Sequence, residues 1–251
     1  MRLVDIHCHI LPGIDDGARS LEESIAMARM AAAAGTTDIV ATPHANNRYV
    51  YDEVVVEEKL AELRAAAGDA IRFHRGCDFH LTPENIRDAL AAPAKYSLAG
   101  RGYLLVEFSD HSVPETAGEI FRKMLSVGLR PVVTHPERNP LLRERLELVE
   151  LWVDLGCFVQ VTAFSVLGRF GKSAKEAADR LLRNSLVHFL ASDAHDCERR
   201  TPALDTAWKY VSKEFGDSAA RGLLKSNPAA ALAGKKVERI RVDPRKKWFG
   251  L

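Results

Sequence analysis

Short apolar runs with the character of β-strands alternate with longer amphipathic segments along this chain. Seven runs are rich in β-branched and aromatic residues and are bounded by polar or turn-forming positions. They are residues 3–6, 38–42, 71–75, 103–108, 131–134, 158–162 and 187–191. Each is short enough for a strand and too short for a typical buried helix.

Helix signals fill the intervals between these runs. Between the first two, Ser20 and Glu23 form a capping box, and Gly35 ends the segment. An apolar stripe links Leu21, Ile25, Ala28 and Ala32. Similar patterns cover residues 52–68, 115–128 and 141–156, and another begins at residues 173–176. Regular β-α alternation predicts an α/β fold with a parallel sheet.

Periodicity alone does not separate an open doubly wound sheet from a barrel. A doubly wound sheet concentrates its chemistry near one switch point, whereas a barrel collects side chains from the carboxyl ends of many strands. Candidate ligands follow nearly every predicted strand here, which favours a TIM-barrel-like arrangement. We expect one domain over residues 1–251, with a peripheral basic tail from about residue 235.

Composition narrows the possible functions. The 251 residues include 35 Lys and Arg and 34 Asp and Glu, which gives a net charge of +1. The sequence has no long block of like charge, so we do not expect it to bind nucleic acid. Neither a signal peptide nor a membrane span is evident, so we expect a cytoplasmic protein that is not membrane-embedded. The four cysteines are scattered and read as reduced thiols.

Candidate metal ligands follow six of the seven predicted strands. In an extended segment His7 and His9 point to the same side and can chelate one ion. Glu107 lies inside an apolar run, where an unpaired carboxylate is costly to bury. The full candidate set is His7, His9, Asp16, His44, Asp78, Glu107, His135, Asp193 and His195.

Nine nitrogen and oxygen donors exceed the needs of one ion. A mixed histidine and carboxylate set suits two or three clustered divalent ions, with Mn, Fe or Zn as the candidates. Two arginines, Arg138 and Arg200, follow ligands closely enough to bind phosphate at the same mouth, although Arg199 is adjacent to the second. We assign the remaining histidines to structural roles. They are His74, His80, His111 and His188.

These residues carry a family resemblance over about residues 3–233. The chain resembles the polymerase and histidinol phosphatase (PHP) superfamily, and within it the bacterial manganese-dependent protein-tyrosine phosphatases of capsule and exopolysaccharide synthesis. The matching segments are DIHCHILPGIDDG (5–17), ATPH (41–44), LVEF (105–108), PVVTHPERN (131–139), QVT (160–162) with GRFG (168–171), and VHFLASDAH (187–195).

The resemblance implies a distorted seven-stranded (β/α) barrel with a trinuclear centre, manganese being the foremost metal. It assigns the ligand role to the nine candidates and phosphate binding to Arg138 and Arg200, and suggests a bacterial tyrosine kinase as protein substrate. Two departures stand out. Asp78 replaces the usual Glu, and Ala45 follows His44 where a second His is common.

The expected reaction is attack of metal-activated hydroxide on a phosphotyrosyl phosphorus. Asp193, His195 or a water is the candidate acid for the departing phenolate. A cysteine-based mechanism is excluded, because no Arg lies six residues beyond any Cys. The alternatives are a PHP phosphatase for histidinol phosphate or a sugar phosphate, and a non-catalytic binding module of the same fold.

Overall fold

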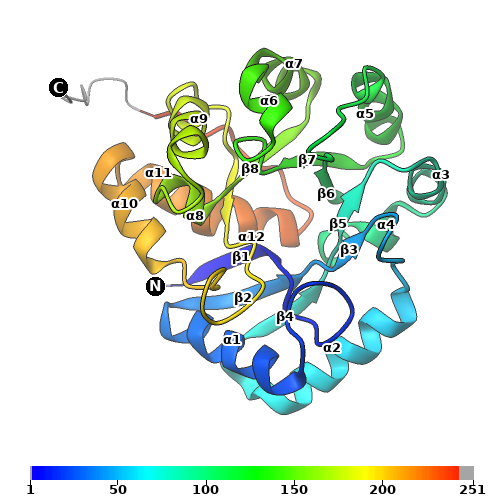
Figure 1. Ribbon diagram of the computed structural model, residues 1–251, viewed down its shortest axis with the longest axis vertical. Helices are drawn as coiled ribbons and strands as arrows, with labels where there is room; N and C mark the ends of the chain where they lie inside the picture. Colours follow the sequence, from blue (N-terminus) through cyan, green and yellow to red (C-terminus); the bar gives the residue numbers. More distant parts are fainter. Residues whose placement is uncertain (1, 243–251) are drawn as a thin grey trace.

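Parallel strands form the centre of the protein and helices surround them (Figure 1). The computed structural model describes residues 2–242. Its strands are β1 (Leu3–Cys8), β2 (Thr36–Ala41), β3 (His44–Ala45), β4 (Arg72–Arg75), β5 (Asp78–His80), β6 (Tyr103–Glu107), β7 (Arg130–Thr134), β8 (Phe158–Thr162) and β9 (Phe189–Ala191). One sheet has the order β1-β2-β4 and the other β3-β5-β6-β7-β8-β9, with parallel pairing throughout.

The strand count differs from the seven that the sequence predicts. All seven predicted runs form strands, but β3 and β5 are additional, and within residues 2–242 the ladder does not close into one barrel. The interruptions that separate β2 from β3 and β4 from β5 lie at Pro43 and Gly76. Pro43 has no N–H to donate to a neighbouring strand. Gly76 lies so close to β2 that a Cβ there would be 2.6 Å from Val40 Cγ1. Beyond these points the chain pairs again, in the second sheet. A bridge between Cys8 and Ala194 joins the region of β1 to that after β9.

Two helices, α1 and α2, begin at the predicted capping residues, whereas α9 begins at Lys172 after Gly171 and has no side-chain cap, so Ser173 lies inside it. Ser20 accepts a hydrogen bond from the Glu23 N–H at the start of α1, and Asp52 caps α2 in the same way. The long helices are α1 (Leu21–Ala33), α2 (Glu53–Ala67), α3 (Pro83–Ala91), α5 (Ala117–Ser126), α7 (Leu146–Leu155), α9 (Lys172–Arg183) and α10 (Asp205–Phe215). The predicted helix 141–156 is divided at Arg145, whose φ of −130° is not helical.

Shorter helical segments complete the chain. They are α4 (Pro93–Tyr96), α6 (Pro140–Glu144), α8 (Ala163–Val166), α11 (Asp217–Arg221), α12 (Asn227–Leu232), η1 (Gly68–Ala70), η2 (Leu98–Gly100) and η3 (Gly222–Ser226). Within residues 2–242, no helix is both long and apolar enough to cross a membrane.

Two apolar clusters hold these layers together. The larger lies between strands and surrounding helices, and the smaller combines inward residues of the strands, such as Ile6 and Leu105, with Ala231 of α12 and with Val237. The Tyr103 hydroxyl donates to the Lys235 carbonyl at 2.8 Å. The segment expected to be peripheral from about residue 235 therefore packs against the strands where it is described, and residues 243–251 lie outside the described residues.

Candidate metal centre

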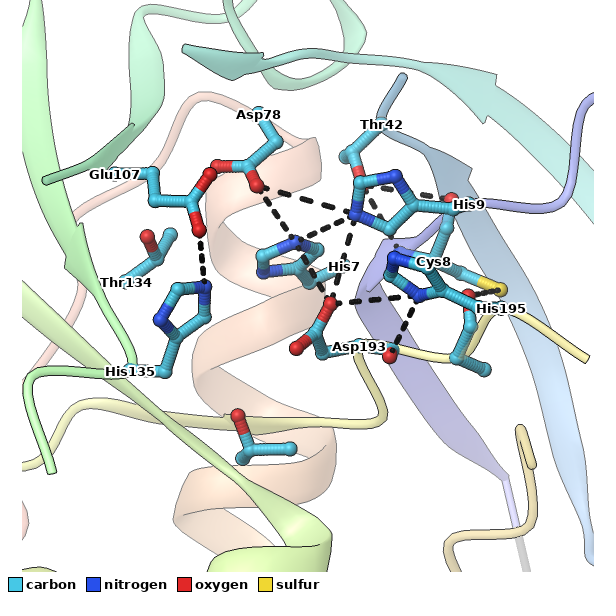
Figure 2. A network of polar contacts seen from close by, with 12 residues as sticks. His7, Cys8, His9, Thr42, Asp78, Glu107, Thr134, His135, Asp193 and His195 are labelled. Carbon is cyan, nitrogen blue, oxygen red and sulfur yellow. Dashed lines mark hydrogen bonds and ion pairs between the residues drawn. The ribbon is translucent and has the colours of Figure 1, made fainter. Parts of the chain in front are cut away.

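The nine candidate ligands converge at the carboxyl ends of the strands, and Figure 2 shows most of them turned toward one another. Their backbone positions explain the convergence, because parallel strands bring their carboxyl ends to one edge. His7 belongs to β1 and His9 follows it, His44 belongs to β3, Asp78 to β5 and Glu107 to β6, while Asp16, His135, Asp193 and His195 lie in loops after strands.

Most of the donor atoms lie farther apart than the partners of good hydrogen bonds, at the spacing of neighbouring ligands on one ion. Metal–ligand bonds of about 2.0–2.2 Å at tetrahedral angles place adjacent donors about 3.3–3.6 Å apart. Contacts in this range predominate, and His9–Asp78 and His195–Asp193 are longer, at 3.9 and 3.8 Å. The shorter contacts are His7–His9 (3.2 Å), His7–Asp78 (3.4 Å), His7–Asp193 (3.5 Å), His44–Asp78 (3.3 Å), His44–Asp16 (3.4 Å), His135–Glu107 (3.5 Å) and His195–Asp16 (3.6 Å).

Asp78 shows most clearly that this site fits cations. Its side chain is 1% exposed, and neither carboxylate oxygen has a hydrogen-bond partner. Burial alone would raise the pKa of Asp78, but the positive imidazoles of His7 and His44 outweigh burial and hold this pKa well below its usual range. A buried carboxylate that stays ionised without hydrogen bonds requires positive charge nearby, which bound divalent ions provide.

The donors divide into four groups, each with ligand atoms within 4.8 Å of one another. Several side chains belong to two groups, so neighbouring cation positions would share ligands. The groups are His9, Asp16, His44 and His195; His7, Asp78 and His135; His7, His9 and Asp193; and His44, His80 and Glu107.

Two side chains outside the candidate set orient His7 in β1 and His9 just after it. The Asp15 carboxylate lies 2.8 Å from His9 Nδ1 and also accepts a hydrogen bond from the Gly17 N–H. Gln160 Oε1 lies 2.9 Å from His7 Nδ1. Such contacts fix the imidazole tautomer and leave each Nε2 free to bind a metal. Asp15 thus forms an Asx turn with Gly17 and also positions His9.

The backbone is strained at two of the candidate ligands. His135 has a φ of 33° and Asp193 a φ of 51°, in the left-handed region that non-glycine residues rarely adopt. His135 follows β7 directly, and Asp193 lies two residues after the end of the short β9. Strain of this kind persists where surrounding contacts over-determine the conformation, and it concentrates at functional sites.

The two candidate phosphate-binding arginines meet at Asp193. Arg138 and Arg200 both donate to Asp193 Oδ2, while Asp193 Oδ1 faces His7 and His9 at 3.5 Å. The Arg138 guanidinium also lies 4.4 Å from the ring centroid of Phe170. Arg199 lines a neighbouring pocket beside Asp16 and His195 instead of contacting Asp193.

An open cleft of about 800 Å³ borders the centre. Arg138, Glu107 and His135 line it on the side of the centre, and Arg48 and Phe108 line it farther out. The loop after β3 forms one wall. In this loop the Tyr49 ring stacks on His44 with 5.9 Å between centroids, whereas Tyr51 is buried away from the cleft.

His80 is the one histidine outside the candidate set that the structure brings into the centre. Its Nε2 contacts Glu107 Oε2 directly. Burial and the neighbouring Asp78 charge raise the pKa of Glu107, whereas this contact with His80 opposes the rise. His74 and His188 have other partners, because His74 contacts Asp38 and His188 Nδ1 accepts from the Val159 N–H.

This combination of a parallel α/β fold and a histidine-carboxylate centre beside two arginines defines a metallohydrolase-like protein. The family described as "Capsular polysaccharide synthesis, CpsB/CapC" matches residues 3–233. The chain belongs to this family, which confirms the resemblance to the capsule-type phosphatases of the PHP superfamily.

Relatives match over nearly their full length. Tyrosine-protein phosphatase YwqE of Bacillus subtilis (strain 168) is 37% identical over 254 residues, covering 99% of both chains. Tyrosine-protein phosphatase CpsB of Streptococcus pneumoniae is 29% identical, over 90% of this chain and 96% of the relative.

A solved structure supports the same relationship. It is described as YwqE from Bacillus subtilis and CpsB from Streptococcus pneumoniae, "unique metal-dependent tyrosine phosphatases". It superimposes with a TM-score of 0.88 at 36% identity, covering 98% of this chain and all of the other.

Proposed function

We propose that this protein is a metal-dependent phosphatase that hydrolyses phosphotyrosine in proteins. The observation that carries the proposal is a ligand-spaced donor cluster beside Arg138, in a chain 37% identical to a tyrosine-protein phosphatase along its whole length. The four cysteines have no nucleophilic role in this reaction, since burial raises the pKa of all four thiols.

The proposed centre holds three divalent ions, with manganese foremost and iron or zinc also suited to the donors. When bound, these cations supply positive charge opposite the phosphoryl oxygens and lower the pKa of a water molecule toward neutrality. Mixed imidazole and carboxylate donors surround each proposed position. The proposed ligands are His7, His9, Asp16, His44, Asp78, Glu107, His135, Asp193 and His195.

Arg138 and Arg200 bind the phosphoryl group in this proposal. A guanidinium presents a planar pair of N–H donors that matches two phosphoryl oxygens, and its charge offsets the charge that develops there. Asp193 holds both guanidinium groups by hydrogen bonds. Phe170 supports Arg138 from its ring face, so less conformational entropy is lost when phosphate binds.

The tyrosyl ring of the substrate extends into the cleft of about 800 Å³, where Phe108 and the loop containing Arg48 line the walls. During hydrolysis, a water oxygen forms a bond to phosphorus and the bond from phosphorus to the phenolic oxygen breaks. The departing phenolate takes up a proton. The attacking water releases this proton, and we propose that Asp193 or His195 passes it to the phenolate. Both side chains start unprotonated. Burial would raise the pKa of Asp193, but nearby positive charges such as Arg200 outweigh burial and hold this pKa well below its usual range, and burial lowers the pKa of His195 to about 3.

Two features of organisation belong to the same proposal. The two sheets act as parts of one distorted seven-stranded barrel, in which β2 continues into β3 and β4 into β5, and residues 1–251 form one catalytic domain.

The protein substrate is a phosphotyrosyl protein, and we propose a bacterial tyrosine kinase of capsule synthesis. Family membership in capsular polysaccharide synthesis supports this choice.

A substrate comparison tests this function against the small-molecule alternative. Manganese-loaded protein is assayed with a phosphotyrosyl peptide, the matching phosphoseryl peptide and histidinol phosphate. We expect the largest kcat/KM for the phosphotyrosyl peptide, because the cleft accommodates an aromatic leaving group. A much larger kcat/KM for histidinol phosphate would overturn the protein-phosphatase assignment.

A further inference from the structure

His80 occupies a position that the proposed reaction does not use. It lies two residues after Asp78 in β5, so both side chains project from the same face of the strand. The strand register pairs His80 with Glu107 of β6, and pairs His44 of β3 with Asp78. Two neighbouring ladders therefore bring His44, His80 and Glu107 to one point.

The donor atoms of these three residues form a compact group within 4.8 Å. His44 Nδ1 lies 3.4 Å from Glu107 Oε2, within the range expected for adjacent ligands of one ion. His44 Nδ1 is buried and has no hydrogen-bond partner, and the His80 Nε2 contacts the same Glu107 oxygen. The group thus contains an unpartnered nitrogen and a carboxylate oxygen that faces two imidazoles.

The surroundings of this group indicate how an ion would enter it from solvent. His80 and Glu107 both line the cleft of about 800 Å³, and their side chains are 21% and 19% exposed. A set of three protein ligands leaves at least one coordination position open, which water or substrate could occupy from the cleft that His80 and Glu107 line. Two imidazoles with one carboxylate suit borderline divalent ions such as Zn²⁺ or Co²⁺.

We propose that His44, His80 and Glu107 form a further cation position on the cleft side of the centre, with His80 as a direct ligand. This inference extends the proposed function, because it adds a cation position next to the place where the substrate would bind. His44 also faces Asp16, at 3.4 Å from its Nε2. Ions on the two sides of His44 would therefore compete for its imidazole.

Replacing His80 with cysteine tests whether this side chain binds the ion directly, and it requires no measurement of turnover. Chelator-stripped, full-length protein carrying His80→Cys is loaded with Co²⁺, and its near-ultraviolet absorption is recorded. We expect a thiolate-to-cobalt charge-transfer band that the wild type lacks. The matched control is His111→Cys, which places a thiol in the same cleft but outside the group.

The variant His80→Asn, which retains an N–H for Glu107 but offers a weaker ligand, provides a second measurement. We expect one Zn²⁺ equivalent to bind about tenfold more weakly than in the wild type, whereas His111→Asn leaves zinc binding unchanged. Absence of the cobalt band in folded His80→Cys, or wild-type zinc binding in His80→Asn, would overturn the proposal. Both readouts remain valid in a protein without phosphatase activity, so failure of the proposed function is distinguishable.

Discussion

Two clusters of histidine and aspartate lie at opposite ends of the strands, and they differ in how their charges are satisfied. At the start of β2 and β4, Asp38 contacts Arg72 at 2.6 and 2.9 Å and His74 at 2.9 Å. Thr37 donates a further hydrogen bond to Asp38. At the carboxyl ends, the corresponding contacts of Asp78 are 3.3–3.9 Å, and its oxygens accept no hydrogen bond.

This difference separates an ion pair from a ligand set that the sequence alone does not distinguish. The carboxylate of Asp38 accepts direct hydrogen bonds from Arg72, His74 and Thr37, so its charge is satisfied without an ion. The oxygens of Asp78 are held at a distance from every imidazole, and the separation matches a shared cation. Substitutions at the two ends should therefore affect different properties.

The largest effect is expected at Glu107, whose Oε1 faces His135 and whose Oε2 faces His44 and His80. Glu107→Gln should lower kcat by about a thousandfold, equivalent to about 4 kcal/mol, and reduce the bound metal. Metal analysis and phosphotyrosyl-peptide assays measure both effects. Glu84→Gln, an exposed change on α3, is the control. Near-normal activity in Glu107→Gln would place the centre elsewhere.

Arg138→Ala should reduce kcat/KM by about a hundredfold through loss of phosphoryl binding. Inhibition by inorganic phosphate should weaken in parallel, while metal content stays at the wild-type level. Arg169→Ala is a matched control, because Arg169 also lies 4.4 Å from a phenylalanine ring, that of Phe164. A loss of metal in Arg138→Ala would show that this arginine maintains the centre instead of binding phosphate.

A smaller effect is expected from the residue that orients His9. Asp15→Asn should weaken metal binding by 10- to 100-fold, roughly, because His9 loses its carboxylate partner at 2.8 Å. Titration of the stripped protein with Mn²⁺ measures the change. The exposed Asp69→Asn serves as the control. Unchanged manganese affinity would contradict the positioning role.

At the other end of the strands, Asp38→Asn should change stability and leave metal content unchanged. Burial would raise the pKa of Asp38, but hydrogen bonds from His74 and Arg72 outweigh it and lower this pKa to about 2. At neutral pH we expect a loss of about 1.5 kcal/mol in the free energy of unfolding.

The sign of the pH dependence follows from the lowered pKa. The Asp38 contribution is complete above the unfolded value of about 3.9 and disappears as the pH falls through about 2. Denaturant unfolding of wild type and Asp38→Asn at several pH values measures it. A stability difference that persists unchanged below pH 2 would contradict this account of the ion pair.

The sequence predicts the location of the centre better than it predicts the sheet. Ligand-type residues after strands are informative because parallel strands align their carboxyl ends, and all nine candidates lie in one region. The short β3 and β5 were missed because each contains only two or three residues. Their pairing depends on neighbouring strands instead of local periodicity.

His80 illustrates how far the sequence can predict the role of a single side chain. Its position two residues beyond Asp78 is visible in the sequence, but its partner Glu107 is 27 residues away on another strand. The register between β5 and β6 is a property of the folded sheet, so the local pattern favours a structural role for this histidine. Spacing from Asp78 is the only signal of its location that the sequence contains.

The most direct test of metal-dependent phosphotyrosine hydrolysis starts from chelator-stripped protein. Hydrolysis of a phosphotyrosyl peptide is measured without metal and after addition of Mn²⁺, Zn²⁺ or Mg²⁺, together with the metal content of the untreated protein. The account predicts no turnover in the stripped protein and recovery with Mn²⁺. Full activity without metal, or no activity with any of these ions, would contradict it.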